Sequence, residues 1–277
     1  MPHPNFTERL FHTDIGKLEL VNTAIVTLSQ QGARLMANIA DKMDIEKCYL
    51  HEKAEGEYIA ERFSRMADLT SNIFNKYEGI IFIAPIGAVV RVIAPHVKDK
   101  TTDPAIVQLD IGGRWAVSLL SGHEGEANTL CMDVANSIGA EPVITSSNEA
   151  GKNIIVGVGC KKGKSAELIK NAVMDALDRA EVSLENVRII ASADVKLYEE
   201  GILEAASQLG VPVRFIHSDE IRNSSLTFER SEFVEKSVNL PAVAEPAALL
   251  AGRRSTLILK KTAYDGITVA VARENFL

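Results

Sequence analysis

Short β-branched runs alternate along this chain with segments of helical periodicity. Thr23–Ser29 (TAIVTLS) is typical of a strand, and the segment QQGARLMANIADKM behind it predicts a helix. Gly79–Pro85 (GIIFIAP) predicts a second strand, which leads into the apolar segment IGAVVRVIAPHV. The runs AIVQLD and WAVSLLSG are separated by IGGR, and a glycine-containing connection of this length suits a β-hairpin.

A helix is expected between His123 and Gly139, because apolar residues recur there at helical spacing and a glycine is typical of a helix end. The residues on the apolar face are Ala127, Leu130, Cys131, Val134, Ala135 and Ile138. The run EPVITSS then predicts another strand.

A second alternating set follows the polar stretch NEAGK, which is the best linker candidate. The runs NIIVGVG, VRIIAS, VPVRFI, STLILKK and ITVAVARE predict strands, and helical periodicity separates several of them. We therefore predict an α/β protein with two domains, 1–150 and 151–277. Each is expected to be a small mixed or mostly parallel sheet flanked by helices.

Composition narrows the function classes. The chain has 277 residues and a formal charge of −7, which argues against a general nucleic-acid binder. Its three cysteines, Cys48, Cys131 and Cys160, have no paired spacing, so we expect neither a disulfide framework nor a zinc cluster. The N-terminus lacks an apolar signal region, and no apolar run reaches the ~18 residues of a spanning helix. These features predict a cytoplasmic protein without a membrane partner.

The stretch GVGCKKGKS resembles a phosphate-binding loop, but its spacing is wrong. Such a loop needs a glycine five residues before Gly163, and Val158 stands there. The stretch then predicts a strand-to-helix turn that carries Lys161, Lys162 and Lys164. Backbone N–H groups and the helix dipole favour anions at such a turn, although a solvated basic turn explains the lysines equally well.

The stretch SLLSGHEGEAN predicts a turn between a strand and a helix. Gly122 and Gly125 bracket His123 and Glu124, which places an imidazole and a carboxylate at a sheet edge where ligands collect. Histidine can give or take a proton near neutral pH. The alternative is that the glutamates complement the helix dipole while the histidine lies in solvent. No second histidine follows at zinc-protease spacing, so we predict no metal site.

Two further groups of charged residues stand near predicted strand ends. Arg91, Lys98 and Lys100 could meet carboxylates, although Lys98 and Lys100 alternate with Asp99 and Asp103 in what could equally be a self-neutralising surface loop.

In the second half, ASADVKLYEEG places Asp194, Lys196 and Glu199 at a strand end, with Lys196 as a candidate anion contact. Ser231 and Glu245 are weaker candidates, since a serine before a helix is usually its cap.

Three strings together resemble a known family. PIGAVVRVIAPHVKDKTTDPAIVQLD, SLLSGHEGEAN and VGVGCKKG, with the segments that follow them, are similar to cobalt-precorrin-5A hydrolases, the CbiG-type enzymes of anaerobic cobalamin biosynthesis. The resemblance runs from about residue 80 to the C-terminus. This chain differs in carrying Glu126 where the family usually has glycine. It also lacks the middle region that many members insert between the two domains.

The resemblance implies that the protein opens the δ-lactone of a cobalt tetrapyrrole and releases acetaldehyde, giving cobalt-precorrin-5B. The cobalt would be carried by the substrate, so no cofactor is expected, and other enzymes of the pathway are candidate partners. For this reaction we predict His123 and Glu124 as the catalytic residues. The residues predicted to bind the corrinoid polycarboxylate are Arg91, Lys98, Lys100, Ser121, Gly122, Gly125, Asn128, Gly159, Cys160, Lys161, Lys162 and Lys196.

This interpretation expects the two polar turns, one from each domain, to face each other across a groove. Two other classes stay open at this stage. One is a non-catalytic corrinoid carrier or scaffold that uses the same turns, and the other is a nucleotide-binding enzyme.

Overall fold

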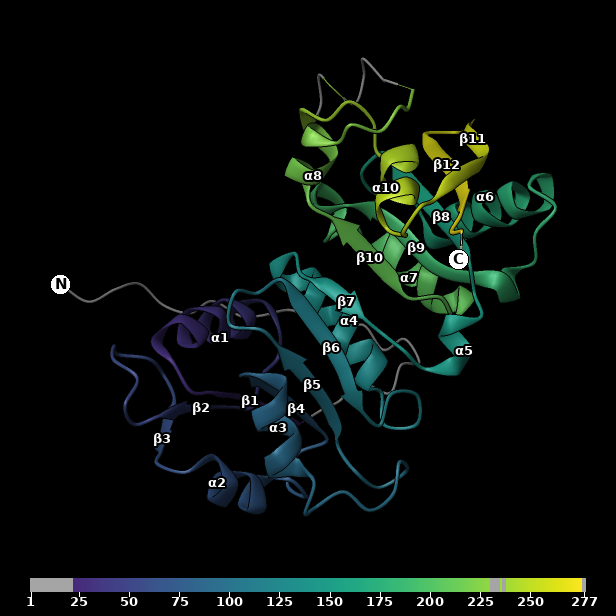
Figure 1. The fold of residues 1–277 in the computed structure, drawn as a ribbon. Helices are drawn as coiled ribbons and strands as arrows, with labels where there is room; N and C mark the ends of the chain where they lie inside the picture. The colour runs from purple at the N-terminus through teal and green to yellow at the C-terminus, as the bar shows by residue number, and fades with distance from the viewer. Residues whose placement is uncertain (1–21, 230–234, 236–237, 276–277) are drawn as a thin grey trace.

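The computed structural model describes residues 22–229, 235 and 238–275. These residues form two α/β lobes that lie against each other (Figure 1). Each lobe contains one mixed β-sheet with helices on both faces. The fold class predicted from the hydrophobic pattern is thereby confirmed.

The first lobe is built on a seven-stranded sheet with the order β3-β2-β1-β4-β5-β6-β7. Strands β6 and β7 run parallel to each other and opposite to the other five. The strands are β1 Thr23–Thr27, β2 Lys47–His51, β3 Glu61–Phe63, β4 Gly79–Ile83, β5 Ala105–Leu109, β6 Trp115–Leu120 and β7 Glu141–Val143.

The central strands of this sheet are buried on both faces, which explains their continuous apolar runs. In β4, Ile81 and Ile83 pack toward α1 (Gln30–Lys42) and α4 (Ala127–Ile138). Their neighbours Ile80 and Phe82 pack on the other face, against α2 and α3. Helix α2 spans Met66–Ile73, and α3 spans Ile86–Ile93.

The second lobe has a five-stranded sheet with the order β10-β9-β8-β12-β11. Strands β8, β9 and β10 are parallel, and the β11–β12 hairpin pairs antiparallel with β8. The strands are β8 Ile154–Cys160, β9 Val187–Ala193, β10 Val213–Ile216, β11 Thr256–Tyr264 and β12 Ile267–Arg273.

Helices α6 (Ala166–Arg179) and α7 (Glu200–Leu209) cover one face of the second sheet. Helices α8 (Ser218–Asn223) and α10 (Ala244–Leu250) cover the other. The short helix α5 (Ser147–Ala150) lies between the two sheets in the chain.

Helix α4 joins the two lobes. The Asn136 side chain donates to Val213 O at 2.8 Å and accepts from Phe215 N at 2.9 Å, so it pairs with the free edge of β10 as a neighbouring strand would. Met132 is buried against the α8 and α10 face of the second lobe. The C-terminal half of α4 therefore belongs to both cores.

Two expected elements have different bounds. The helix expected from His123 begins at Ala127, because residues 121–126 form a turn with positive φ at two non-glycine positions. The strand expected over EPVITSS is only the three-residue β7, because the chain turns into α5 after Ser146.

Candidate functional site

The turn Ser121–Gly125, here called the SGHEG turn, connects the end of β6 to the start of α4. Ser121 has φ +58°, and its hydroxyl donates to Asp103 O at 2.9 Å. Gly125 N donates to Ser121 O at 3.1 Å, and a Cβ on Gly125 would lie 2.5 Å from the Ser121 Cβ. The turn is therefore closed on itself and leaves no room for a side chain at Gly125.

Asn128 holds the SGHEG turn in place. Its Oδ1 accepts from the Ser118 hydroxyl at 2.8 Å, and its Nδ2 donates to Ser146 Oγ at 3.1 Å. Its backbone N–H donates to Gly122 O at 2.9 Å. The Asn128 amide is thus occupied by protein partners on both sides. These contacts assign it a positioning role beside its predicted role in substrate binding.

The two predicted catalytic side chains, His123 and Glu124, are both exposed at the tip of the turn. Glu124 forms an ion pair with Lys100, which comes from the loop before β5. The hydrogen bond from Lys100 lowers the pKa of Glu124, and the nearby His123 adds to this effect. The same bond raises the pKa of Lys100. Glu124 therefore stays ionised and paired, whereas the structure gives His123 no hydrogen-bond partner among the described residues.

The charged loop before β5 is shaped by Asp103, which is buried. One Asp103 carboxylate oxygen accepts from the backbone N–H groups of Lys98 and Asp99, at 2.8 and 3.1 Å. This loop brings Lys100 to the SGHEG turn. The other predicted cation, Arg91, lies on α3, where it donates to Gly87 O at 2.8 Å.

In the second lobe, the glycines of GVGCKKGKS serve packing. Gly157 and Gly159 lie within β8, and α10 begins directly against them. A Cβ on Gly157 would lie 1.9 Å from Ala244 O, and one on Gly159 would lie 3.2 Å from the Val243 Cβ. Because these glycines are strand residues under a helix, they do not form a loop around a phosphate.

Several candidate residues meet at the carboxyl end of β8. Lys196 pairs with Glu199 at 3.2 Å, and both side chains are largely buried. Glu199 also accepts from Gly163 N at 2.5 Å, which pins the turn before α6. Burial raises the pKa of the Cys160 thiol to about 11. Cys160 is therefore a neutral thiol, and Lys196 already has a carboxylate partner. Lys161 and Lys162 are exposed on the same turn.

The two polar turns do not face each other as expected. The SGHEG turn comes before the first residue of α4. Gly139 lies at the other end of α4, where a Cβ on it would be 3.7 Å from the His217 ring. His217 follows β10 and Cys160 ends β8, so both lie at the carboxyl edge of the second sheet. A helix of 12 residues, roughly 18 Å long, therefore separates the two turns.

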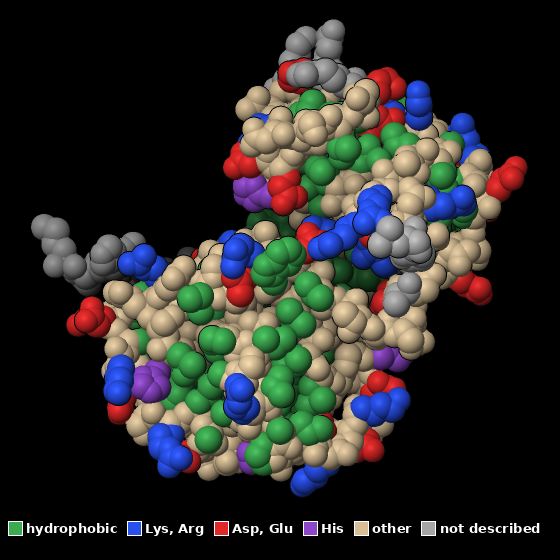
Figure 2. All heavy atoms as spheres, viewed as in Figure 1, with side chains coloured by type: hydrophobic (Ala, Val, Ile, Leu, Met, Phe, Trp, Pro, Cys, Tyr) green, Lys and Arg blue, Asp and Glu red, His purple; other side chains and the backbone are tan. Residues whose placement is uncertain are grey.

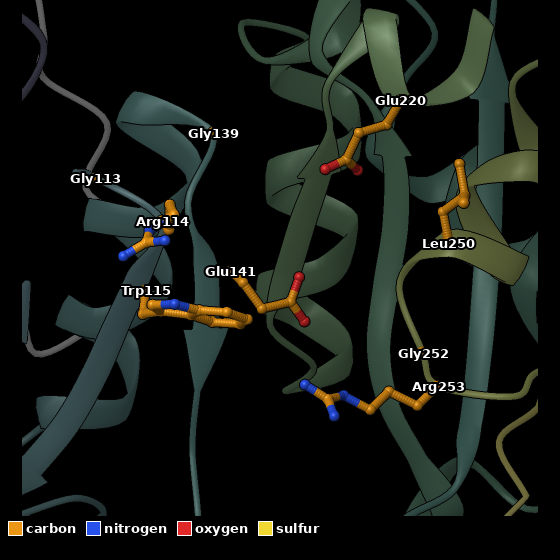
Figure 3. A pocket seen from close by; sticks show the side chains of 9 residues that line it. All are labelled: Gly113, Arg114, Trp115, Gly139, Glu141, Glu220, Leu250, Gly252 and Arg253. Atoms are coloured by element: carbon orange, nitrogen blue, oxygen red, sulfur yellow. The ribbon is translucent and has the colours of Figure 1, made fainter. Parts of the chain in front are cut away.

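A cavity of about 510 Å³ opens between the lobes at the other end of β6 (Figure 3). Its first-lobe wall is formed where β6 and β7 begin, and its second-lobe wall by α8 and the end of α10. It is lined by Gly113, Arg114, Trp115, Gly139, Glu141, Glu220, Leu250, Gly252 and Arg253.

None of these cavity residues was a candidate from the sequence. Trp115 is the one tryptophan of the chain and could have been noted for that reason, but its exposure is seen only in the structure. Arg253 is one of two adjacent arginines in the loop between α10 and β11, and no motif surrounds it. Only the contact between the two lobes brings Arg253 to the same cavity as Trp115.

The weaker candidates have simple explanations or cannot be placed. Glu245 is buried, and its two carboxylate oxygens accept from Glu229 N at 2.7 Å and Lys261 N at 2.9 Å, so it fastens two segments together. Ser231 lies outside the described residues.

Across residues 22–229, 235 and 238–275, the structure contains no group of three or more metal-binding side chains. No helix in that part is long and apolar enough to cross a membrane.

The fold and these turns define a two-lobed α/β protein with polar strand-to-helix junctions in each lobe. The family described as cobalamin synthesis G N-terminal matches residues 68–149, and the family described as cobalamin synthesis G C-terminus matches residues 154–272. The chain therefore belongs to the cobalamin synthesis G family, the CbiG-type family that its motifs resemble. The two matched regions almost adjoin, which leaves no room for a middle region.

Curated relatives extend this result over nearly the whole chain. The cobalt-precorrin-5A hydrolase of Priestia megaterium is 26% identical, and the match covers 90% of this chain and 94% of that protein. The Salmonella typhimurium enzyme of the same name is 22% identical, over 90% and 96%. The Priestia alignment is 352 residues long, longer than this chain, so that relative has residues with no counterpart here.

A shorter relative matches less than half of the chain. Protein CobE of a Sinorhizobium species is 33% identical over 46% of this chain and 83% of that protein. Among solved structures, a putative cobalamin biosynthesis protein G homolog from Sulfolobus solfataricus is 21% identical, covers 92% of this chain and 98% of that chain, and has a TM-score of 0.37.

Proposed function

We propose that this protein is a cobalt-precorrin-5A hydrolase, which opens the δ-lactone of the cobalt tetrapyrrole and releases acetaldehyde to give cobalt-precorrin-5B. The observation that carries the proposal is the match to two such hydrolases over about nine-tenths of this chain and of each relative. Because the match covers most of each protein, the proposal concerns the complete reaction of a two-lobed enzyme without the middle region.

The SGHEG turn has the groups that lactone opening needs. The exposed His123 imidazole acts as the base, and its side chain is not tied to a neighbour among the described residues. The backbone N–H groups of Gly122 and His123 have no acceptor within the part of the chain that the structure describes. Such N–H groups can stabilise the oxyanion that forms when water attacks a carbonyl.

The first step is hydrolysis. The water oxygen forms a bond to the lactone carbonyl carbon while His123 takes the water proton. The ring C–O bond then breaks, and the departing oxygen receives the proton as a hydroxyl. Glu124, kept ionised by Lys100, stabilises the imidazolium that exists between these two proton transfers.

The second step releases the two-carbon unit. The freed hydroxyl loses its proton, its oxygen forms the C=O bond of acetaldehyde, and the carbon–carbon bond to the macrocycle breaks. The electron pair moves into the conjugated macrocycle, which then takes up a proton. The macrocycle and its cobalt belong to the substrate, so this step needs no cofactor of the protein.

Incubation with the lactone substrate tests the proposal and separates it from a carrier role. An enzyme gives one acetaldehyde per macrocycle, and the macrocycle gains a water and loses acetaldehyde in mass. A carrier or scaffold retains the lactone form unchanged. Binding without any change in mass therefore overturns the proposed activity.

A further inference from the structure

The cavity between the lobes has an aromatic surface without a protein partner on it. Trp115 begins β6, and its side chain is 41% exposed. Glu141 holds the paired position on β7, and its carboxylate points away from the indole toward the second lobe (Figure 3). Burial of large aromatic side chains is favourable, so an indole held open at a cavity is suited to a flat conjugated ligand.

The exposed apolar surface continues from Trp115 along β6. Side chains alternate along a strand, so Val117 and Leu119 lie on the same face as Trp115, and both are half-buried. The opposite face of β6 is covered by α4, where Ser118 bonds Asn128. Figure 2 shows hydrophobic side chains gathered on this side of the first lobe. On α3 of the same lobe, Ile86 and Val90 are each 45% exposed.

The second lobe adds an unpaired cation to the cavity. The Arg253 guanidinium points toward Trp115 and Glu141 (Figure 3), and the described residues offer it neither a carboxylate nor a carbonyl partner. The other arginines nearby are engaged. Arg214 pairs with Glu141 and Arg114 with Asp110. Arg253 is therefore the guanidinium available to a carboxylate of a ligand.

Three glycines form part of the cavity wall. Gly113 and Gly139 have φ of +68° and +72°, and Gly252 lies where a Cβ would be 2.3 Å from Ile155 Cδ1. A Cβ on Gly113 would meet Leu35, so Gly113 and Gly252 are glycines for backbone conformation and packing, and the cavity wall at these positions is backbone. Glu220 stands at the opposite side of the opening from Arg253 (Figure 3).

We propose that the cavity binds one edge of the tetrapyrrole, with the conjugated ring against Trp115 and a carboxylate arm on Arg253. This inference rests on the proposed function. The ring then lies along the exposed face of β6, whose six residues span roughly 20 Å. A tetrapyrrole with its acid arms can cover such a strip, so its far edge reaches the SGHEG turn. The cavity thereby places the lactone at His123.

The single tryptophan makes binding at this cavity directly measurable. The probe is cobyrinic acid, a stable cobalt corrinoid polycarboxylate, and the matched ligand is its fully esterified form. We expect the acid to quench Trp115 fluorescence, after correction for its own absorption, with saturation at the Kd found by equilibrium dialysis. Binding that leaves Trp115 emission unchanged overturns the proposal.

Variants separate the two contacts. Arg253→Ala is expected to weaken binding of the acid roughly tenfold, the usual magnitude for a charge-assisted hydrogen bond, and to leave binding of the ester unchanged. Trp115→Ala is expected to weaken both, as measured by dialysis. Glu220→Gln removes a repelling charge and is expected to tighten binding of the acid about twofold. Arg179→Ala, on the far surface of α6, is the matched control.

The outcomes also distinguish this inference from the proposed function. All variants are first checked by circular dichroism for native structure. If the wild-type protein releases acetaldehyde but Arg253→Ala and Trp115→Ala bind the acid as the control does, the cavity proposal is wrong and the enzyme assignment stands. If the acid binds as described but no acetaldehyde forms, the enzyme assignment is lost and the cavity site remains.

Discussion

Lys100 and Glu124 form an ion pair that connects the loop before β5 to the turn after β6. The pair joins two of the motifs recognised in the sequence, although 24 residues separate them along the chain. It leaves Glu124 ionised, while the neighbouring His123 is exposed and has no hydrogen-bond partner among the described residues.

Removing the Lys100 charge is expected to return the pKa of Glu124 toward the ordinary value of a glutamate. A lowered carboxylate pKa contributes stability above the unfolded-state pKa, and that contribution disappears as the pH falls through the folded-state value. In Lys100→Met, less stability should therefore be lost as the pH falls from the unfolded-state pKa of Glu124 to its folded-state pKa. Carboxyl carbon NMR titration of Glu124 measures the change. Lys98→Met is the control, and equal effects from both variants contradict the pairing.

Glu126 is a strained position that can be relieved. It stands before α4 with φ +65°, and its carboxylate accepts from the Thr129 hydroxyl at 2.7 Å. A left-handed conformation costs a non-glycine residue about 1–2 kcal/mol. The greater freedom of glycine in the unfolded chain and loss of the Thr129 bond offset part of the gain.

We therefore expect Glu126→Gly to stabilise the protein by about 0.5–1 kcal/mol in urea denaturation. Glu126→Gln keeps the strained backbone and should give no gain. A destabilised glycine variant shows that the Thr129 bond outweighs the strain.

The β8 glycines make a second stability prediction. Gly157→Ala places a methyl group against Ala244 O and should cost about 3 kcal/mol or more, since the backbone of α10 cannot move aside easily. Gly151→Ala, where the nearest atom is 3.9 Å away, should change stability by less than about 0.5 kcal/mol.

Because the β8 glycines do not form a phosphate-binding loop, ATP titration of the wild-type protein should give no binding. Tight ATP binding would restore the nucleotide-enzyme alternative.

The contact between the lobes depends on a half-buried ion pair. Arg214 is nearly buried, and its guanidinium bonds both Glu141 and Ala251 O, the latter at 2.9 Å. Glu141→Gln leaves this charge with the carbonyl as its main partner and should destabilise the protein by about 1–3 kcal/mol. The double variant with Arg214→Met should recover part of that loss, and strictly additive losses would show that the pair is not coupled.

Local patterns in the sequence predicted the central elements well. Runs such as Gly79–Ile83 are strands because both of their faces are buried, and the helix Gln30–Lys42 has a clear apolar face. The edge strand Glu61–Phe63 was not predicted, because its residues are largely exposed and lack a hydrophobic pattern. The start of α4 was misplaced, since positive φ at Glu126 is not visible in a residue of good helix propensity.

The candidate site was predictable only in its separate parts. The SGHEG turn and the turn at Cys160 were recognised as strand-to-helix junctions, which is where each lies. Their relative position depends on how α4 packs against β10, and no local pattern encodes that contact. The same contact creates the cavity of Trp115 and Arg253, so the residues of that cavity could not be grouped from the sequence.

The most direct test compares acetaldehyde release in single-turnover reactions of the lactone substrate with the wild-type protein, His123→Gln and His96→Gln. His96 is a half-buried histidine that bonds Ser71 and lies beyond α3, outside the SGHEG turn, so it serves as the control. We expect the wild type and the His96 variant to release one acetaldehyde per macrocycle, and the His123 variant to be slower by about 10²-fold or more. Equal release by all three proteins would contradict the account.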